Sequence, residues 1–210
     1  MSEFPPVPSR PLRVISVCTG NLCRSPTAEQ LLRARLDPGW QFAEFTSAGT
    51  MAASGEPMHP RAAAWSQKLG GDPSLHRSVY LAAKLLGPVD LALGMARQHR
   101  RSVVDLRPAI TKATFTLAEF ARLAAEVSNA ELERAVTSLP RRATSSERLR
   151  VLLPLLARAR SLGLPLYELV DDVIDPIGRE PEVFEQSAQQ IDAAVDQVVR
   201  VLKVTLATAW

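Results

Sequence analysis

Val17-Cys18-Thr19-Gly20-Asn21-Leu22-Cys23-Arg24-Ser25-Pro26 is the stretch that decides the fold of this chain. It follows the apolar run 14–17 and leads into residues 27–36, whose composition is typical of a helix. The pattern predicts a strand, a tight loop and a helix. A cysteine and an arginine stand at the two ends of this loop, beside a helix N-terminus. We therefore predict an oxyanion-binding loop here, and with it the active site.

The predicted loop has the groups that hold an anion. A turn from a strand into a helix presents several backbone N–H groups to one point, and the helix dipole adds positive potential. Gly20 allows a close turn of the backbone, Ser25 is the expected helix cap, and Pro26 at the first helical position loses no useful donor. The same field favours the thiolate form of Cys18.

A thiolate in a phosphate-sized nest predicts attack on phosphorus. Arg24 offers a planar fork to two oxygens of the phosphoryl group, and with the loop amides it would stabilise the transition state. Asp175, which precedes Pro176 in a loop, is our candidate donor of a proton to the leaving oxygen. Its neighbours Asp171 and Asp172 either tune it or face solvent.

The rest of the chain predicts an α/β protein. Apolar segments at 42–46, 89–95 and 113–117 are expected strands, and 60–69 and 79–86 are expected helices. Alternating strands and helices of this length predict a single domain with a central parallel sheet and helices on both faces. Ligands in such folds bind at the carboxyl ends of the strands, which is where Cys18 falls.

The domain organisation has two further features. Residues 1–12 contain four prolines and are expected to form a flexible tail, with one domain over 13–210. An extra helical insertion is expected at about 123–168, before the loop that holds Asp175; Pro154 should kink or cut its second helix. This insertion either completes the core as a helical hairpin or binds a partner. A long amphipathic helix is expected from 182 to about 206.

Composition narrows the class of protein. The chain has 210 residues, of which 46% are hydrophobic and 22% charged, as is usual for a globular domain. We expect a cytoplasmic protein that binds no membrane, because no signal peptide or membrane span is recognised. The two cysteines lie in one loop, which argues against a secreted disulfide scaffold. A net charge of +3 with scattered basic residues argues against nucleic-acid binding, and the three scattered histidines predict no metal site.

The loop resembles the signature of the low-molecular-weight protein tyrosine phosphatases, and Asp175-Pro176 resembles the acid loop of that family. Ser47-Ala48-Gly49-Thr50 matches a further family block, so that the resemblance covers roughly 13–120 and 170–200. It implies a phosphocysteine intermediate at Cys18, with Asp175 as the acid of the first step and the base of the second. It also implies that neither a metal nor a cofactor is needed.

The resemblance implies roles for further residues. The phosphate-binding residues would be Thr19, Gly20, Asn21, Leu22, Cys23 and Arg24. A supporting hydrogen-bond network would consist of Asn21, Ser25, Ser47 and His76. Cys23 would form a reversible disulfide with Cys18 that protects the nucleophile; otherwise it is a small buried residue. His76 could equally be an ordinary surface histidine, and His99 is expected to be solvated among arginines.

Two departures from the family pattern concern the substrate. An aromatic residue usually follows the Asp-Pro pair, and another lies three residues past the Ser-Ala-Gly-Thr block; this chain has Ile177 and Ala53. These pocket walls lack the ring stacking that favours phosphotyrosine. With the resemblance, the sequence predicts a cysteine-dependent phosphatase for phosphotyrosine in proteins, with a different small phosphomonoester as the other candidate substrate.

Two alternatives stay open from sequence. The first is an arsenate reductase that uses an external thiol cofactor on the same loop. The second is a non-catalytic oxyanion-binding regulatory module. The sequence does not determine the oligomeric state.

Overall fold

The structure is a computed structural model that describes residues 10–36, 42–161 and 171–206. Within these residues, four strands form one parallel sheet in the order β2-β1-β3-β4. The strands are β1 Leu12–Cys18, β2 Ala43–Gly49, β3 Leu91–Gly94 and β4 Thr114–Thr116. The helices are α1 Arg24–Arg35, α2 Pro60–Lys68, α3 Arg97–Leu106, α4 Leu117–Ala125, α5 Asn129–Thr137, α6 Ser145–Ser161 and α7 Pro181–Leu206. The α/β class and the parallel sheet predicted from the sequence are confirmed.

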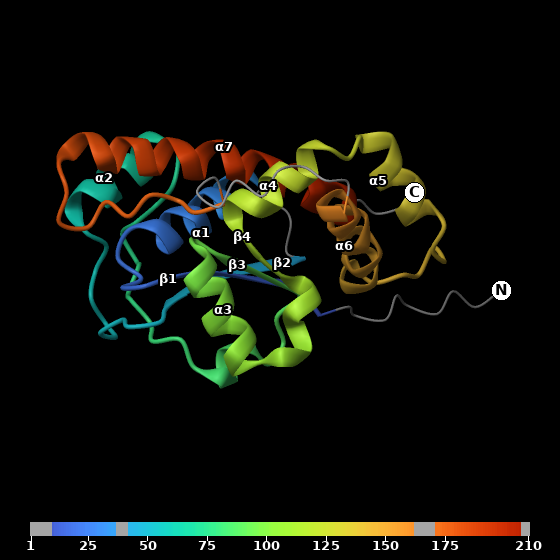
Figure 1. Cartoon of the computed structure of the whole chain (residues 1–210), viewed down its shortest axis with the longest axis horizontal. Coiled ribbons are helices and arrows are strands. Elements are labelled where there is room, and N and C mark those ends of the chain that lie inside the picture. Colours follow the sequence, from blue (N-terminus) through green and yellow to red (C-terminus); the bar gives the residue numbers. More distant parts are fainter. Residues whose placement is uncertain (1–9, 37–41, 162–170, 207–210) are drawn as a thin grey trace.

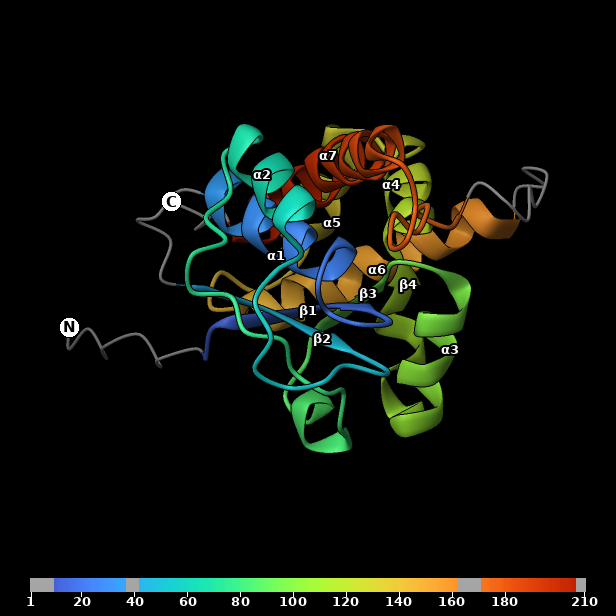
Figure 2. The same ribbon diagram turned by 90° about the vertical axis from the view of Figure 1, so that its left-hand side faces the viewer.

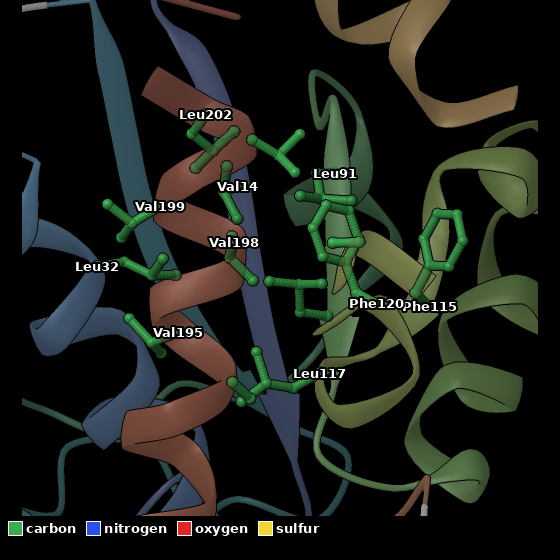
Figure 3. Packing of buried hydrophobic residues seen from close by; sticks show 14 of the residues in the cluster. Val14, Leu32, Leu91, Phe115, Leu117, Phe120, Val195, Val198, Val199 and Leu202 are labelled. Carbon is green, nitrogen blue, oxygen red and sulfur yellow. The ribbon is translucent and has the colours of Figure 1, made fainter. Parts of the chain in front are cut away.

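Helices cover both faces of the sheet (Figure 1), as the sequence predicts. The larger core lies between the sheet and α1, α4 and α7, and Figure 3 shows Val198 and Leu202 of α7 near Val14 of β1. The smaller core lies on the other face, where Ile15 and Val17 pack with residues that include Val103 of α3. Alternate residues of β1 thus enter different cores, as expected for a strand buried on both faces.

The insertion packs into the larger core. Leu132 of α5 and Leu149, Leu152 and Leu156 of α6 are all buried in it. This packing favours the helical hairpin that completes the core. Pro154 neither cuts nor ends α6, which runs to Ser161; Pro154 is exposed, and buried leucines on both sides of it hold the helix in place.

One other local prediction is wrong. The helix expected at 79–86 is reduced to a short 3-10 helix, Ala83–Leu86. The segment before it runs along the edge of β2, because Gly49 N donates to Val79 O (2.8 Å) and Leu81 N donates to Gly49 O (2.8 Å). No described helix is both long and apolar enough to cross a membrane.

Candidate active site

The anion-binding loop, residues 18–24, joins β1 to α1 at the edge where the strands end (Figure 2). Asn21 adopts a left-handed conformation with φ of 55°, which asparagine tolerates better than most residues. Helix α1 begins at Arg24, with Cys23 as its cap residue and no side-chain cap. Ser25 is therefore not the helix cap that the sequence predicts. Its position in the first turn releases its hydroxyl for another contact.

Two donors point at the sulfur of Cys18. Asn21 N lies 3.2 Å and Ser25 Oγ 3.0 Å from Cys18 Sγ. The Cys18 residue is 3% exposed, so that few waters can compete with these contacts. Both contacts hold the sulfur against the loop and the first turn of α1.

The predicted supporting residues meet around Asn21. Its Nδ2 donates to Ser25 Oγ (2.9 Å) and Ser47 Oγ (2.8 Å), and its Oδ1 accepts from the backbone of Val79 (2.8 Å). His76 Nε2 lies 2.8 Å from Asn21 O. Because a carbonyl oxygen only accepts, His76 carries a proton on Nε2. His76 thus braces the loop and is not a free surface residue.

Glu29 extends this network, and the sequence reasoning missed it. Ser47 Oγ donates to Glu29 Oε2 (2.5 Å), and Glu29 also pairs with Arg33 on the same helix. The spacing of Glu29 and Arg33 is visible in the sequence. The contact with Ser47 is not, because it joins α1 to β2.

Arg24 and Asp175 lie together although 151 positions separate them. Arg24 Nη2 is 2.5 Å from Asp175 Oδ2, and Arg24 Nη1 donates to Val173 O (3.2 Å). Arg24 is buried, whereas the Asp175 side chain is 44% exposed. The structure thus brings the candidate arginine and the candidate acid to the same side of the anion-binding loop.

The neighbouring aspartates have partners of their own. Asp171 pairs with Arg122 (2.9 Å), while Asp172 accepts from the backbone N–H of Arg97 (2.7 Å). Neither simply faces solvent, and each is bound to a basic or N–H group rather than to Asp175. Both contacts fasten the segment 171–178, the acid loop, to the rest of the fold.

Cys23 is a buried free thiol, as is Cys18. Burial raises the pKa of Cys23 to about 12; the charges of Cys18 and Asp175 act in the same direction, and Arg24 opposes them. Cys23 is accordingly a protonated thiol at neutral pH. Cys18 Sγ, by contrast, lies against the donors Asn21 N and Ser25 Oγ.

His99 is buried, with 1% exposure, and the expectation that it is solvated is wrong. Its Nε2 lies 2.9 Å from Thr19 Oγ1. Burial lowers the pKa of His99 to about 4, and Arg24 lowers it further, against Asp175 and Asp172. The ring is therefore neutral at neutral pH. Spacing could have revealed this burial, since His99 lies four positions before the buried Val103 on α3.

A cavity of about 500 Å³ opens beside these residues. Arg24, residues 96–98 and residues 172–175 line it. The two residues predicted as pocket walls lie at the surface: Ile177 is 50% exposed, and Ala53 is exposed. Neither supplies a ring.

The close approach in this site belongs to Gly49 rather than to Gly20. A Cβ on Gly20 would meet only the Leu22 side chain, at 3.7 Å. A Cβ on Gly49 would lie 2.5 Å from Thr19 O and 2.8 Å from Asn21 N, both in the backbone of the anion-binding loop. The loop therefore rests directly on the end of β2.

We expect Gly49→Ala to lower kcat/KM for p-nitrophenyl phosphate by roughly tenfold to a hundredfold, because the loop must shift to admit the methyl group. Steady-state kinetics with the purified variant measure this. Gly87→Ala is the matched control, since a Cβ there meets no atom closer than 3.4 Å. Equal activity of Gly49→Ala and Gly87→Ala would contradict the expectation.

Comparisons with known proteins agree with this geometry. The family model described as low molecular weight phosphotyrosine protein phosphatase matches residues 13–133, a range that ends before Asp175. The probable low molecular weight protein-tyrosine-phosphatase EpsP of Ralstonia solanacearum is 39% identical over 106 residues, covering 50% of this chain and 70% of that protein. A protein-arginine-phosphatase of Geobacillus stearothermophilus is 36% identical over 110 residues, covering 52% of this chain and 72% of that protein.

A solved structure extends the likeness beyond the matched segment. The low molecular weight protein tyrosine phosphatase from T. tengcongensis aligns with a TM-score of 0.62 and 28% identity. The alignment covers 90% of this chain and 97% of that one.

Proposed function

The chain belongs to the low molecular weight phosphotyrosine protein phosphatase family, and on that premise we propose that it hydrolyses phosphorylated proteins with Cys18 as nucleophile, Arg24 as oxyanion ligand and Asp175 as acid. The observation that carries the proposal is the Arg24–Asp175 contact of 2.5 Å. It brings an acid loop from late in the chain to the loop whose cysteine receives two hydrogen bonds. A non-catalytic module would not require this juxtaposition.

The proposed reaction has two steps. Cys18 Sγ attacks phosphorus, the sulfur–phosphorus bond forms, and the bond to the leaving oxygen breaks while Asp175 gives that oxygen its proton. Water then attacks the phosphocysteine, Asp175 takes a proton from it, and the sulfur–phosphorus bond breaks to release phosphate. Arg24 and the N–H groups of residues 19–24 hold the charged oxygens throughout.

Phosphotyrosine is the substrate group that we propose first. Relatives named as tyrosine phosphatases and one named as an arginine phosphatase both match this chain. With Ala53 and Ile177 as walls, the pocket lacks the extra ring stacking of about 0.5–1.5 kcal/mol that an aromatic wall supplies. We therefore expect the enzyme to discriminate only modestly between aryl and other phosphates.

Two further properties belong to the proposal. Cys23, a buried thiol in the same loop, would trap an oxidised Cys18 as a reversible disulfide. A catalytic free thiol functions in a reducing compartment, so we place the protein in the cytoplasm. An arsenate reductase on this loop is disfavoured, since the named relatives are phosphatases.

A substrate panel tests the proposed specificity. We expect the wild type to hydrolyse phosphotyrosine peptides and, less efficiently, alkyl phosphates and phosphoarginine. Ile177→Tyr should raise kcat/KM for phosphotyrosine by about two- to tenfold, because it adds a ring beside Asp175. Phosphate release measured for each substrate gives the ratios of kcat/KM between substrates for each variant.

Leu106→Tyr is the control, because it adds the same ring at an exposed position on the far end of α3. Unchanged selectivity of Ile177→Tyr would remove the role of this pocket wall. Absence of hydrolysis of every phosphate in the panel would overturn the proposed function itself.

A further inference from the structure

The first turn of α3 touches both loops of the proposed active site. Gly94 ends β3, and a Cβ there would lie 2.7 Å from Arg100 N and 3.2 Å from the backbone carbon of His99. Only glycine lets α3 sit this closely on the strand. The close packing sets the first turn of α3 beside the ends of β1 and β3, where the anion-binding loop lies.

On one side this turn holds the anion-binding loop. His99 Nε2 contacts Thr19 Oγ1 at 2.9 Å, and Thr19 is the residue directly after Cys18. On the opposite side of the loop, Met51 N donates to Thr19 O (2.9 Å). The start of the loop is thus clamped between α3 and the segment that follows β2.

On its other side the same turn holds the acid loop. Asp172 Oδ1 accepts from Arg97 N (2.7 Å), at the N-terminus of α3. Val173 N donates to Met95 O (2.8 Å), just before the helix. Asp175 follows only two residues after Val173, so these contacts set its distance from the anion-binding loop.

We propose that residues 95–99 form a bracket that fixes Asp175 relative to Cys18, with His99 as the positioning residue toward the anion-binding loop and Asp172 as the positioning residue toward the acid loop. The inference rests on the proposed phosphatase function. It assigns His99, a buried neutral ring, to the alignment of Thr19. It assigns Asp172 to the placement of the acid.

The His99 half of the bracket is tested with four variants: His99→Leu, His99→Gln, Thr19→Val and the double variant His99→Leu/Thr19→Val. We expect His99→Leu and Thr19→Val each to lower kcat on p-nitrophenyl phosphate by on the order of tenfold, with KM changed less than about twofold, because a displaced loop harms the transition state most. The double variant should be no slower than the slower single variant, since both remove one contact.

His99→Gln should recover most of the activity, because its amide can still reach Thr19 Oγ1. Thermal unfolding of each variant separates loss of alignment from loss of fold. Multiplying effects in the double variant, or equal loss in His99→Gln and His99→Leu, would overturn this half of the proposal. If His99→Leu does not fold, the comparison of His99→Gln with Thr19→Val still decides it.

The Asp172 half predicts a different signature. Asp172→Ala should slow an alkyl phosphate at least fivefold more than p-nitrophenyl phosphate, because only the poorer leaving group depends strongly on a well-placed acid. Asp105→Asn, which removes an exposed acid paired with Arg101 on the same helix, is the matched control. Equal slowing of both substrates by Asp172→Ala would overturn this half. An inactive wild type would instead overturn the proposed function.

Discussion

Cys18→Ser is expected to abolish turnover, by on the order of 10⁴-fold or more, while oxyanion binding persists. The hydroxyl is a far weaker nucleophile than a thiolate. Most contacts that would hold an oxyanion are unaffected, because Arg24 and the loop N–H groups other than that of Asn21 do not contact the sulfur in the described structure. Phosphate release from p-nitrophenyl phosphate measures turnover, and calorimetric titration with vanadate measures binding.

Cys23→Ser is the matched control for this variant. It makes the same substitution in the same loop, at a thiol whose pKa is raised to about 12 by burial. It should keep most of the turnover under reducing conditions. Full activity of Cys18→Ser would end the assignment of the nucleophile, and loss of vanadate binding would show that the substitution damages the loop.

Asp175→Asn is expected to slow hydrolysis by roughly 10² to 10⁴-fold for alkyl phosphates, because the amide cannot donate the proton that their leaving oxygen needs. The loss should be smaller for p-nitrophenyl phosphate, whose leaving group departs as an anion. A series of aryl and alkyl phosphates with leaving groups of graded acidity measures how the loss of rate depends on the leaving group.

Glu180→Gln is the control for the acid, since it neutralises an exposed carboxylate a few residues further along the chain. It should leave the rate unchanged across the series. If Asp175→Asn slowed every substrate by the same factor, Asp175 would support the arginine rather than supply the proton.

The parts of the fold that the sequence predicts well are those set by neighbours in the chain. The strand, loop and helix around Cys18 follow from an apolar run, a glycine and helix-forming residues within 25 positions. The long helix α7 follows from its amphipathic pattern, and its observed bounds, Pro181–Leu206, agree closely with the expectation.

The predictions of local structure fail where contacts between distant parts of the chain determine the conformation. The segment 79–86 has a composition that suits a helix, yet backbone hydrogen bonds that join residues 79 and 81 to Gly49 keep its first part extended. Ser25 looks like a cap, yet the helix begins one residue earlier and its hydroxyl turns to Cys18. Proline ends many helices, but α6 continues through Pro154 because its flanking leucines are buried.

The same distinction holds within the site. The motif names Cys18, Arg24 and Asp175, and the structure brings Arg24 and Asp175 into contact. The sequence motif could not indicate that Glu29 contacts Ser47, or that His99 contacts Thr19, because each of these pairs joins two separate elements. Such pairing follows from the packing of helices on the sheet.

The ion pair between Arg24 and Asp175 has a consequence for product inhibition. The Arg24 guanidinium contacts the side chain of Asp175, and the proposed mechanism uses the same guanidinium to bind phosphate, so that Asp175 and phosphate compete for Arg24. Free phosphate binds Arg24 more weakly than it would without this competition. The carboxylate can return to the arginine as the product leaves. On the proposed mechanism, Asp175 competes with inorganic phosphate for Arg24, which favours release of the product after each turnover.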